Sequence, residues 1–399
     1  MARGRARRVV RHDAERIPSR GVSQSRARHP TSAKRGGFTP LAVGPDDGNA
    51  PCRESPLAAL ESEITPTDRF FVRSHFPVPA VDAVRWRVVV DGEVRQRLSL
   101  TLGQLKRMPH HDVVATVECA GNSRSSMSPR AEGVLWGHGA VGTARWRGVP
   151  LAFILERAGL NPGVHEVVLR GADRGKEPGA NGVIDYEMSV PIEKATDPDT
   201  LVVDSMNGRP LELRHGFPLR VVVPGWYGMA SVKWLTRVTA VASPFKGYFR
   251  GRAYTYIHEG EAFEGPRAPA TTARVKALIT WPGERHVLSQ GRHRVRGVAW
   301  SGDAAIARVE VSGSPNSDDR LSWRPARLRP SLSPYAWRHW EVELDLLRPG
   351  FYTLRARATD ARGRRQPMRA DWNYRGIGNN SVHCVPVEVR RTRPKDAEA

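Results

Sequence analysis

Residues 113–150 read VVATVECAGNSRSSMSPRAEGVLWGHGAVGTARWRGVP. The β-branched run 113–117 predicts a strand, and the Gly-Asn pair after Cys119 predicts a turn. Glu118 and Arg124 flank the cysteine, so we expect the chain to leave the core where the sulfur lies. A thiolate at such a junction, with a cation close by, is suited to bind one thiophilic metal.

Three interpretations of Cys119 are open from the residues alone. It can be a small buried hydrophobic residue, which is the default for a lone cysteine. It can be a nucleophile, which needs a base that the fold brings to it. It can also be a metal ligand; because Cys52 and Cys384 lie far away in unlike sequence contexts, a zinc or iron-sulfur site is disfavoured and the remaining ligands would come from a cofactor.

A second group of polar residues lies in residues 214–234, RHGFPLRVVVPGWYGMASVKW. His215, Arg220 and Lys233 surround a β-branched run that predicts a buried strand. Buried cations without partners cost several kcal/mol each, so this pattern favours an anionic ligand. The alternative is a set of exposed charges at strand ends.

The chain has 399 residues and a net charge of +21, with 40% apolar residues and 11 Trp. This composition predicts about two folded domains. Residues 1–35 hold eleven Arg or Lys and two acidic residues, so we expect a disordered basic arm over residues 1–40. Nucleic-acid binding is the alternative function class for such charge, but no nucleic-acid-binding module is apparent in the sequence.

The domain organisation follows from a change in pattern near residue 260. Residues 41–260 mix strands and short helices, whereas residues 270–392 contain short alternating strands at the spacing of a β-sandwich. Residues 393–399 form a tail. The fold class is therefore α+β, a mixed domain followed by an all-β domain. The GHGAVG stretch at 137–142 matches a dinucleotide motif, but it does not open a helix, so no nucleotide is implied.

Several local elements are predicted in the first domain. Thr101 and Gln104 form a capping box at the start of a helix. The apolar spacing after Pro150 predicts a helix with one buried face. Turns are predicted at Asp91-Gly92, at Asn207-Gly208 and after the strand in HEVVLRGADRG, where the polar turn would carry Asp173.

The start of the chain has no apolar segment of the length that a secretory signal needs, and no stretch of 18 apolar residues occurs. These features predict a cytoplasmic protein without a membrane span, or a periplasmic one if the start codon is misassigned. Three cysteines fit a reducing compartment.

The central stretch resembles a known family. ECAGNSR followed by GVLWGHGAVGTARWRGVPL is similar to the molybdenum-cofactor domain of the sulfite oxidase family. Further similar stretches are FFVRSHFPVP at 70–79, residues 206–235 and WNYRGIGNN at 372–380. Four motifs in the same order are more specific than any one of them.

The resemblance implies a molybdopterin cofactor whose molybdenum is bound by Cys119. It implies these cofactor-binding residues: Arg73, His75, Cys119, Asp173, His215, Arg220, Ser231 and Lys233. It implies these catalytic residues: Arg73, Arg124, Trp136, Tyr254 and Arg375. The implied reaction is oxidation of sulfite to sulfate by oxygen-atom transfer, with electrons passed to a separate acceptor such as a cytochrome. The all-β domain would be immunoglobulin-like and would form a homodimer.

Three points stay open at this stage. Ser123 stands where the family often has a first arginine, which puts details of the cofactor contacts in doubt. Tyr256 competes with Tyr254 as the active-site tyrosine. Nitrate reductases share the same molybdenum core, so reduction of nitrate, or oxygen-atom transfer with another oxyanion or a sulfoxide, is an alternative reaction.

Overall fold

The computed structural model describes residues 51–258, 260–261, 267–316 and 321–391. These residues belong to one compact unit. The predicted basic arm at 1–40 and the tail at 393–399 lie outside the described residues. None of the helices described is long and apolar enough to cross a membrane.

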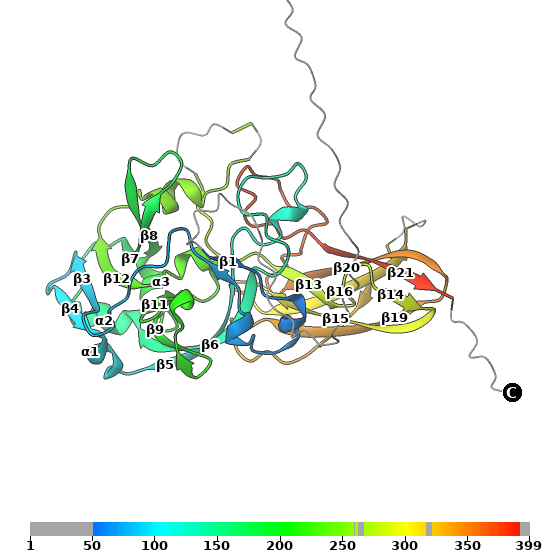
Figure 1. The fold of residues 1–399 in the computed structure, drawn as a ribbon, viewed down its shortest axis with the longest axis horizontal. Coiled ribbons are helices and arrows are strands. Elements are labelled where there is room, and N and C mark those ends of the chain that lie inside the picture. The colour runs from blue at the N-terminus through cyan, green and yellow to red at the C-terminus, as the bar shows by residue number, and fades with distance from the viewer. Residues whose placement is uncertain (1–50, 259, 262–266, 317–320, 392–399) are drawn as a thin grey trace, which may run out of the picture. The chain divides into compact units, whose positions relative to one another are not determined.

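Two five-stranded sheets form the first part of the chain (Figure 1). The first has the order β10-β9-β6-β5, with β11 paired to β9, and contains β5 (His111–Glu118), β6 (Val141–Pro150), β9 (Leu201–Met206), β10 (Arg209–Pro210) and β11 (Arg220–Val222). The second has the order β4-β3-β12-β7-β8 and contains β3 (Arg87–Gly92), β4 (Leu98–Thr101), β7 (Glu166–Lys176), β8 (Val183–Pro191) and β12 (Leu235–Val241). A short ribbon joins β1 (Cys52–Arg53) to β2 (Val72–Arg73).

Helices in this part are few and short. The α-helices are α1 (Leu102–Lys106), α2 (Leu151–Ala158) and α3 (Ile192–Ala195). The short 3₁₀ helices are η1 (Leu57–Glu61), η2 (Thr67–Arg69), η3 (Arg124–Ser126), η4 (Leu213–His215) and η5 (Gly228–Ala230). The element η6 (Phe249–Ala253) is a π-helical turn. The predicted capping box at Thr101 and Gln104 is confirmed. Helix α2 buries the predicted face, namely Leu151, Ile154, Leu155 and Ala158.

Two of the three predicted turns differ from the structure. The hairpin at Asn207-Gly208 is confirmed, with φ of 53° and 77°. Asp91 instead lies inside β3, because β12 pairs with it and Arg237 and Thr239 bind its carboxylate, whereas Gly92 ends the strand with a φ of 84°. Asp173 lies inside β7, because pairing with β8 resumes beyond it after an irregularity in the register.

Residues 276–390, called here the C-terminal β-region, contain strands and no helix among those described. One sheet has the order β13-β15-β19-β18, formed by β13 (Lys276–Trp281), β15 (Gly291–Trp300), β18 (Arg327–Leu328) and β19 (Arg338–Leu346). The other has the order β14-β21-β20-β16-β17, formed by β14 (Val287–Ser289), β16 (Ile306–Pro315), β17 (Arg324–Pro325), β20 (Gly350–Asp360) and β21 (His383–Arg390). Alternate side chains of both sheets share one apolar core.

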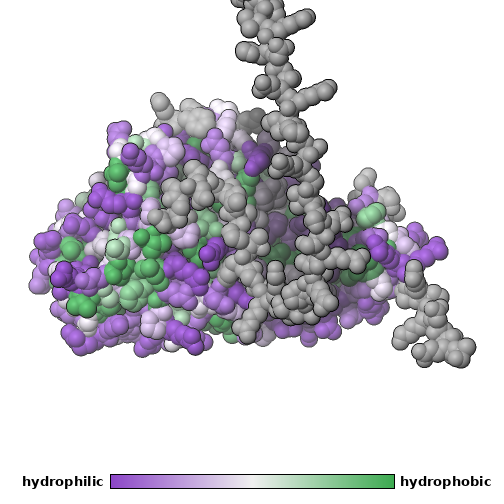
Figure 2. All heavy atoms as spheres, in the orientation of Figure 1, coloured by the Kyte–Doolittle hydropathy of each residue, from purple (hydrophilic) through white to green (hydrophobic). Residues whose placement is uncertain are grey.

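Apolar side chains also join the C-terminal β-region to the first part of the chain. Leu60 and Val141 pack with Trp300 and Trp337 in one buried cluster. The exterior is different, since the face in Figure 2 is mostly hydrophilic with smaller hydrophobic patches. The two parts therefore meet through packed apolar side chains. This contact lies close to the end of β5, where Cys119 follows, because Val141 pairs with Glu118.

Candidate active site

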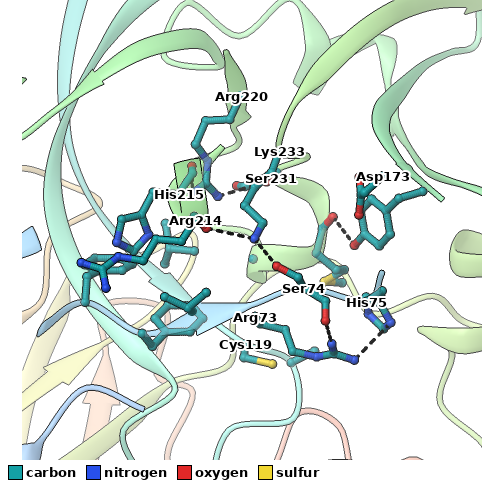
Figure 3. Close-up of a pocket in the computed structure, with 18 of the residues that line it drawn as sticks. Arg73, Ser74, His75, Cys119, Asp173, Arg214, His215, Arg220, Ser231 and Lys233 are labelled. Carbon is teal, nitrogen blue, oxygen red and sulfur yellow. Dashed lines mark hydrogen bonds between the residues drawn. The ribbon is translucent and has the colours of Figure 1, made fainter. Parts of the chain in front are cut away.

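A cleft opens where the ends of β2, β5, β7 and β11 meet the turns η4 and η5. Its empty space, measured out to its open mouth, is about 670 Å³, which is in the range of ligand pockets. Its polar and ionisable lining residues are Arg73, Ser74, His75, Cys119, Asp173, Tyr186, Arg214, His215, Arg220, Ser231, Lys233 and Tyr254. Figure 3 shows Lys233 between Arg220 and Ser74, with Cys119 and Arg73 across the opening.

Cys119 follows the last residue of β5 and is fixed by its turn. Its N–H donates to the carbonyl of Ala140 at 2.9 Å, and its carbonyl accepts from the N–H of Asn122 at 2.9 Å. The residue is 7% exposed. Burial raises the pKa of the Cys119 thiol, although Arg124 and Arg73 oppose that rise. The thiol would therefore have to release its proton on binding a metal.

A cationic wall is formed by two groups, the buried Arg220 and the half-buried Lys233. Arg220 donates to the carbonyls of His215 at 3.1 Å and Ser231 at 3.0 Å. Lys233 donates to Ser74 Oγ at 2.6 Å and to the carbonyl of Arg214 at 3.1 Å. These partners are neutral carbonyl and hydroxyl oxygens, which do not cancel the charges of Arg220 and Lys233, so an anion in the cleft would be stabilised.

The same burial changes how readily these cations hold their protons. Burial lowers the pKa of Arg220 to about 10. Burial and the charge of Arg220 lower the pKa of Lys233 to about 7. Ser231 Oγ accepts from the N–H of Val223 at 3.1 Å, which leaves its hydroxyl proton for another acceptor.

Asp173 supplies the opposite feature, a buried acceptor that lacks a donor. Its side-chain Oδ1 has no hydrogen-bond partner among the described residues, and the residue is only 4% exposed. Burial raises the pKa of Asp173 to about 6, although Lys233 opposes the rise. Leaving such an atom unpaired costs energy, so a ligand that offers an N–H group would fit here. The cleft therefore suits a ligand that combines an anionic group with a ring bearing N–H donors, as molybdopterin does.

His75 lies at the centre of a hydrogen-bonded group. Its Nε2 is 2.6 Å from the hydroxyl of Tyr254, and its Nδ1 is 3.1 Å from Glu177 Oε1 and 3.1 Å from Arg73 Nη2. Burial and the charge of Arg73 lower the pKa of His75 to about 4. Burial raises the pKa of Tyr254, so both groups are neutral near pH 7.

His215 is a second neutral imidazole in the cleft. Burial and the charge of Arg220 lower its pKa to about 3. Its Nε2 is 3.2 Å from the carbonyl of Thr67, to which a neutral ring donates its proton. That bond leaves Nδ1 as an acceptor.

The structure brings every predicted cofactor-binding residue, and Tyr254, to the cleft. Three predicted catalytic residues do not line it. Arg124 is buried beside it and donates from Nε to the carbonyl of Arg375 at 2.9 Å. Arg375 itself is half-buried. Trp136 is 0% exposed and packs in the same apolar cluster as Cys119, so its ring lies in the core and does not contact the space in the cleft.

The two competing tyrosines have different surroundings. Tyr254 lines the cleft. The ring of Tyr256 lies 4.6 Å from the Arg274 guanidinium and is not part of the lining. The geometry therefore favours Tyr254.

Sequence reasoning missed several lining residues. Ser74 and Arg214 both bind Lys233, and Tyr186 donates to the carbonyl of Met229 at 2.9 Å. Ser74 lies between two predicted residues and Arg214 precedes a third, so adjacency along the chain was a usable signal. Tyr186 lies on β8 without any motif, and only the sheet order places it at the cleft.

Comparisons with known proteins agree with this geometry. Residues 75–249 match the oxidoreductase molybdopterin binding domain, and residues 268–390 match the Mo-co oxidoreductase dimerisation domain. The mitochondrial sulfite oxidase of Drosophila melanogaster is 33% identical over 84% of this chain, which spans 61% of that protein. The sulfite oxidase of Gallus gallus is 36% identical, with 84% of this chain and 75% of that protein covered.

Two further similarities concern the reaction and the fold. A nitrate reductase [NADH] of Phaseolus vulgaris is 32% identical over 84% of this chain and 41% of that protein. The crystal structure of the sulfane dehydrogenase SoxCD from Paracoccus pantotrophus aligns with a TM-score of 0.74 and 27% identity, covering 87% of each chain.

Proposed function

Because the chain belongs to the sulfite oxidase family of molybdopterin oxidoreductases, we propose that it oxidises sulfite to sulfate and passes the electrons to an external acceptor. One observation carries this proposal: a single thiol, converging cations and an unpaired buried carboxylate oxygen line one cleft. The chain spans less than two thirds of the mitochondrial relatives it matches, so the activity is argued from the cleft itself.

The cofactor would be held at two ends. Cys119 would bind the molybdenum through its thiolate. Arg220, Lys233 and Ser231 would hold the terminal phosphate, while His215, His75 and Asp173 would hydrogen-bond the pterin. The bound cofactor supplies the oxygen-atom transfer and stores two electrons.

The protein would bind and orient a small dianion beside the metal. Arg73 lines the cleft, and Arg124 lies within electrostatic reach of Cys119 and Tyr254. Arg375 lies beside Arg124. These guanidinium groups would replace the water around sulfite and fix its orientation, and the neutral Tyr254 hydroxyl would donate a hydrogen bond. Trp136 would support Cys119 from the core.

Metal analysis and a substrate comparison test this function. The chain, expressed in a host that makes the molybdenum cofactor, should contain molybdenum by elemental analysis. It should reduce an artificial acceptor when sulfite is added. A chain without molybdenum, or a loaded chain inactive with sulfite, contradicts the proposal.

A second reaction is favoured by one comparison, since a nitrate reductase is 32% identical over most of this chain. Nitrate is a planar monoanion, whereas sulfite is a pyramidal dianion with a lone pair on sulfur. Measuring nitrate reduction with an artificial donor in the same preparation separates the two reactions. A sulfane-sulfur compound is tested as a third candidate substrate in the same assay, because the structural neighbour is a sulfane dehydrogenase.

We also propose that residues 270–392 form an immunoglobulin-like domain through which two copies associate. The match of residues 268–390 to a dimerisation domain supports this. Light scattering on the purified chain should give twice the monomer mass of 44.2 kDa.

The electron acceptor would be a separate protein such as a cytochrome. All three cysteines are free, which fits the reducing, cytoplasmic compartment expected from the sequence.

A further inference from the structure

Lys276 and Glu118 form the most deeply buried ion pair in the described part of the chain. Lys276 Nζ lies 3.1 Å from Glu118 Oε1, and the side chains are 2% and 3% exposed. Burying two charges costs several kcal/mol per ion before their attraction is counted, and a well-packed apolar pair is often at least as stable. Stability alone therefore does not account for the choice of this pair.

Every polar atom of the pair has a partner. Glu118 Oε1 accepts from Asn122 Nδ2 at 3.0 Å as well as from Lys276, and Glu118 Oε2 accepts from Trp300 Nε1 at 2.9 Å. Lys276 also donates to the carbonyls of Asn122 at 3.4 Å and Asn379 at 2.8 Å. The three ammonium hydrogens thus have three acceptors, so the geometry of the group is fully determined.

The pair connects the cysteine turn to the C-terminal β-region. Glu118 is the last residue of β5 and precedes Cys119, whereas Lys276 begins β13. Asn122 closes the cysteine turn: its N–H donates to the Cys119 carbonyl, and its Oδ1 accepts from the N–H of Ala140 at 3.1 Å. Lys276 therefore holds both ends of the turn that carries the sulfur.

Other groups of the C-terminal β-region bind the same turn. The N–H of Gly378 donates to the carbonyl of Ala120 at 2.7 Å. Asn379 Nδ2 donates to the carbonyl of Ser123 at 2.7 Å. Lys276 binds the Asn379 carbonyl, so it links this outer contact to Glu118. The turn is thus bound from both sides by groups that lie far away in the sequence.

We propose that Lys276 is a positioning residue, which acts through Glu118 and Asn122 to fix Cys119 and Arg124 at the spacing that the metal and substrate need. The C-terminal β-region would then complete the active site in addition to any role in association. This inference rests on the proposed function in assuming that Cys119 binds the metal and that Arg124 binds the substrate. Groups that orient a metal ligand typically change metal affinity or activity by about 10- to 100-fold when removed.

A set of four full-length variants tests the proposal. Lys276→Met removes the cation, Glu118→Gln removes the anion, and the double variant removes both charges while keeping similar shapes. Arg357→Met is the matched control, because it breaks an ion pair with Glu310 inside the C-terminal β-region, where the side chains are 18% and 15% exposed. Arg357 does not contact the cysteine turn in the described structure.

Hydrogen exchange is measured first, on chains without cofactor. In Lys276→Met, amides of residues 119–126 should exchange about tenfold faster or more, because hydrogen bonds to a charged group are lost and the turn opens more readily, whereas Arg357→Met should leave them unchanged. The double variant should recover the thermal midpoint, because no charge is left uncompensated, yet residues 119–126 should still exchange faster than in wild type. If these amides exchange as slowly as in wild type in both variants that lack Lys276, the proposal is overturned.

The cofactor-loaded chains give an independent readout. The double variant should show a shifted molybdenum(V) paramagnetic resonance signal and a higher KM for sulfite, since Asn122 and Asn379 have lost their common partner. A wild-type signal and wild-type KM in the double variant mean that the pair only stabilises the fold. If wild type binds no molybdenum, the proposed function fails, whereas the exchange result still decides whether Lys276 fixes the turn.

Discussion

The hydroxyl of Tyr254 lies 2.6 Å from Nε2 of His75, a residue 179 positions earlier in the chain. Burial and Arg73 keep the imidazole neutral by lowering its pKa to about 4, while burial raises the pKa of the phenol. A neutral ring and a neutral phenol therefore share one short hydrogen bond at the wall of the cleft. The phenol is thus held in place at a position where it can reach a ligand.

Tyr254→Phe removes the hydroxyl and keeps the ring. A hydrogen bond to a charged ligand contributes about 1.5–3 kcal/mol, so kcat/KM for sulfite should fall about 10- to 100-fold. The molybdenum content should stay at the wild-type level, because no ligand to the metal changes. The matched control is Tyr256→Phe, since that ring packs against Arg274 outside the cleft lining. Equal losses in the two variants would show that Tyr254 has no special role.

Cys119→Ser tests the metal ligand without altering the size of the side chain much. The variant should fold, because the thiol donates no hydrogen bond to any residue that the structure describes. It should contain almost no molybdenum by elemental analysis, since a neutral hydroxyl is a poor ligand for a thiophilic metal. Cys384→Ser changes an exposed thiol on β21 and should retain the metal. Full molybdenum content in Cys119→Ser would remove the central assumption of the proposed function.

Features of this fold are predictable from the sequence when the residues that decide them lie close together along the chain. The capping box at Thr101 and the hairpin at Asn207-Gly208 were predictable because each is decided by residues within a few positions. The strand before Cys119 was predictable because its β-branched run is unambiguous. Asp91 was misassigned to a turn because β12, which pairs with it, lies almost 150 residues further along the chain.

In the candidate site too, local motifs predict which residues are present, but not their contacts with residues far away in the sequence. Motif resemblance located His215, Arg220 and Lys233, but it could not show that their hydrogens bind neutral oxygens and leave the charges uncancelled. Trp136 was expected in the pocket from its motif, yet its ring is fully buried. The Lys276–Glu118 pair was not predicted at all, because nothing near either residue in the sequence indicates a partner 158 positions away.

The buried histidines predict how the stability of the chain without cofactor depends on pH. Burial and the charge of Arg220 lower the pKa of His215 to about 3 in the folded state, from its ordinary value of 6.5. The unfolded chain therefore binds a proton that the folded chain excludes, and stability is lost as the pH falls from about 6.5 towards the folded pKa. The thermal midpoint should fall between pH 7 and pH 5, and less steeply in His215→Gln.

The control for this effect is His293→Gln, which changes a half-buried histidine on β15. It shows how far a substitution of histidine by glutamine by itself changes the slope of the thermal midpoint against pH. A slope in His215→Gln that equals the wild-type slope would mean that protonation of His215 does not contribute to acid unfolding.

Lys233 predicts a pH-dependent anion affinity in the cleft before any cofactor is bound. Burial and Arg220 lower its pKa to about 7, with Asp173 opposing them and Arg73 adding to them. The ammonium loses its proton as the pH rises through 7, so the affinity for sulfate, which stays a dianion throughout, should fall by up to about tenfold between pH 6 and pH 8. Calorimetry at pH 7.5 should also show proton uptake on binding, because the bound anion favours the charged form of Lys233.

The controls are two lysine variants. Lys233→Met should bind sulfate weakly and without proton uptake, whereas Lys194→Met, which removes an ion pair with Asp197 outside this cleft, should behave like wild type. Equal sulfate affinity at pH 6 and pH 8 in the wild-type chain would show that the charge of Lys233 does not change over this range.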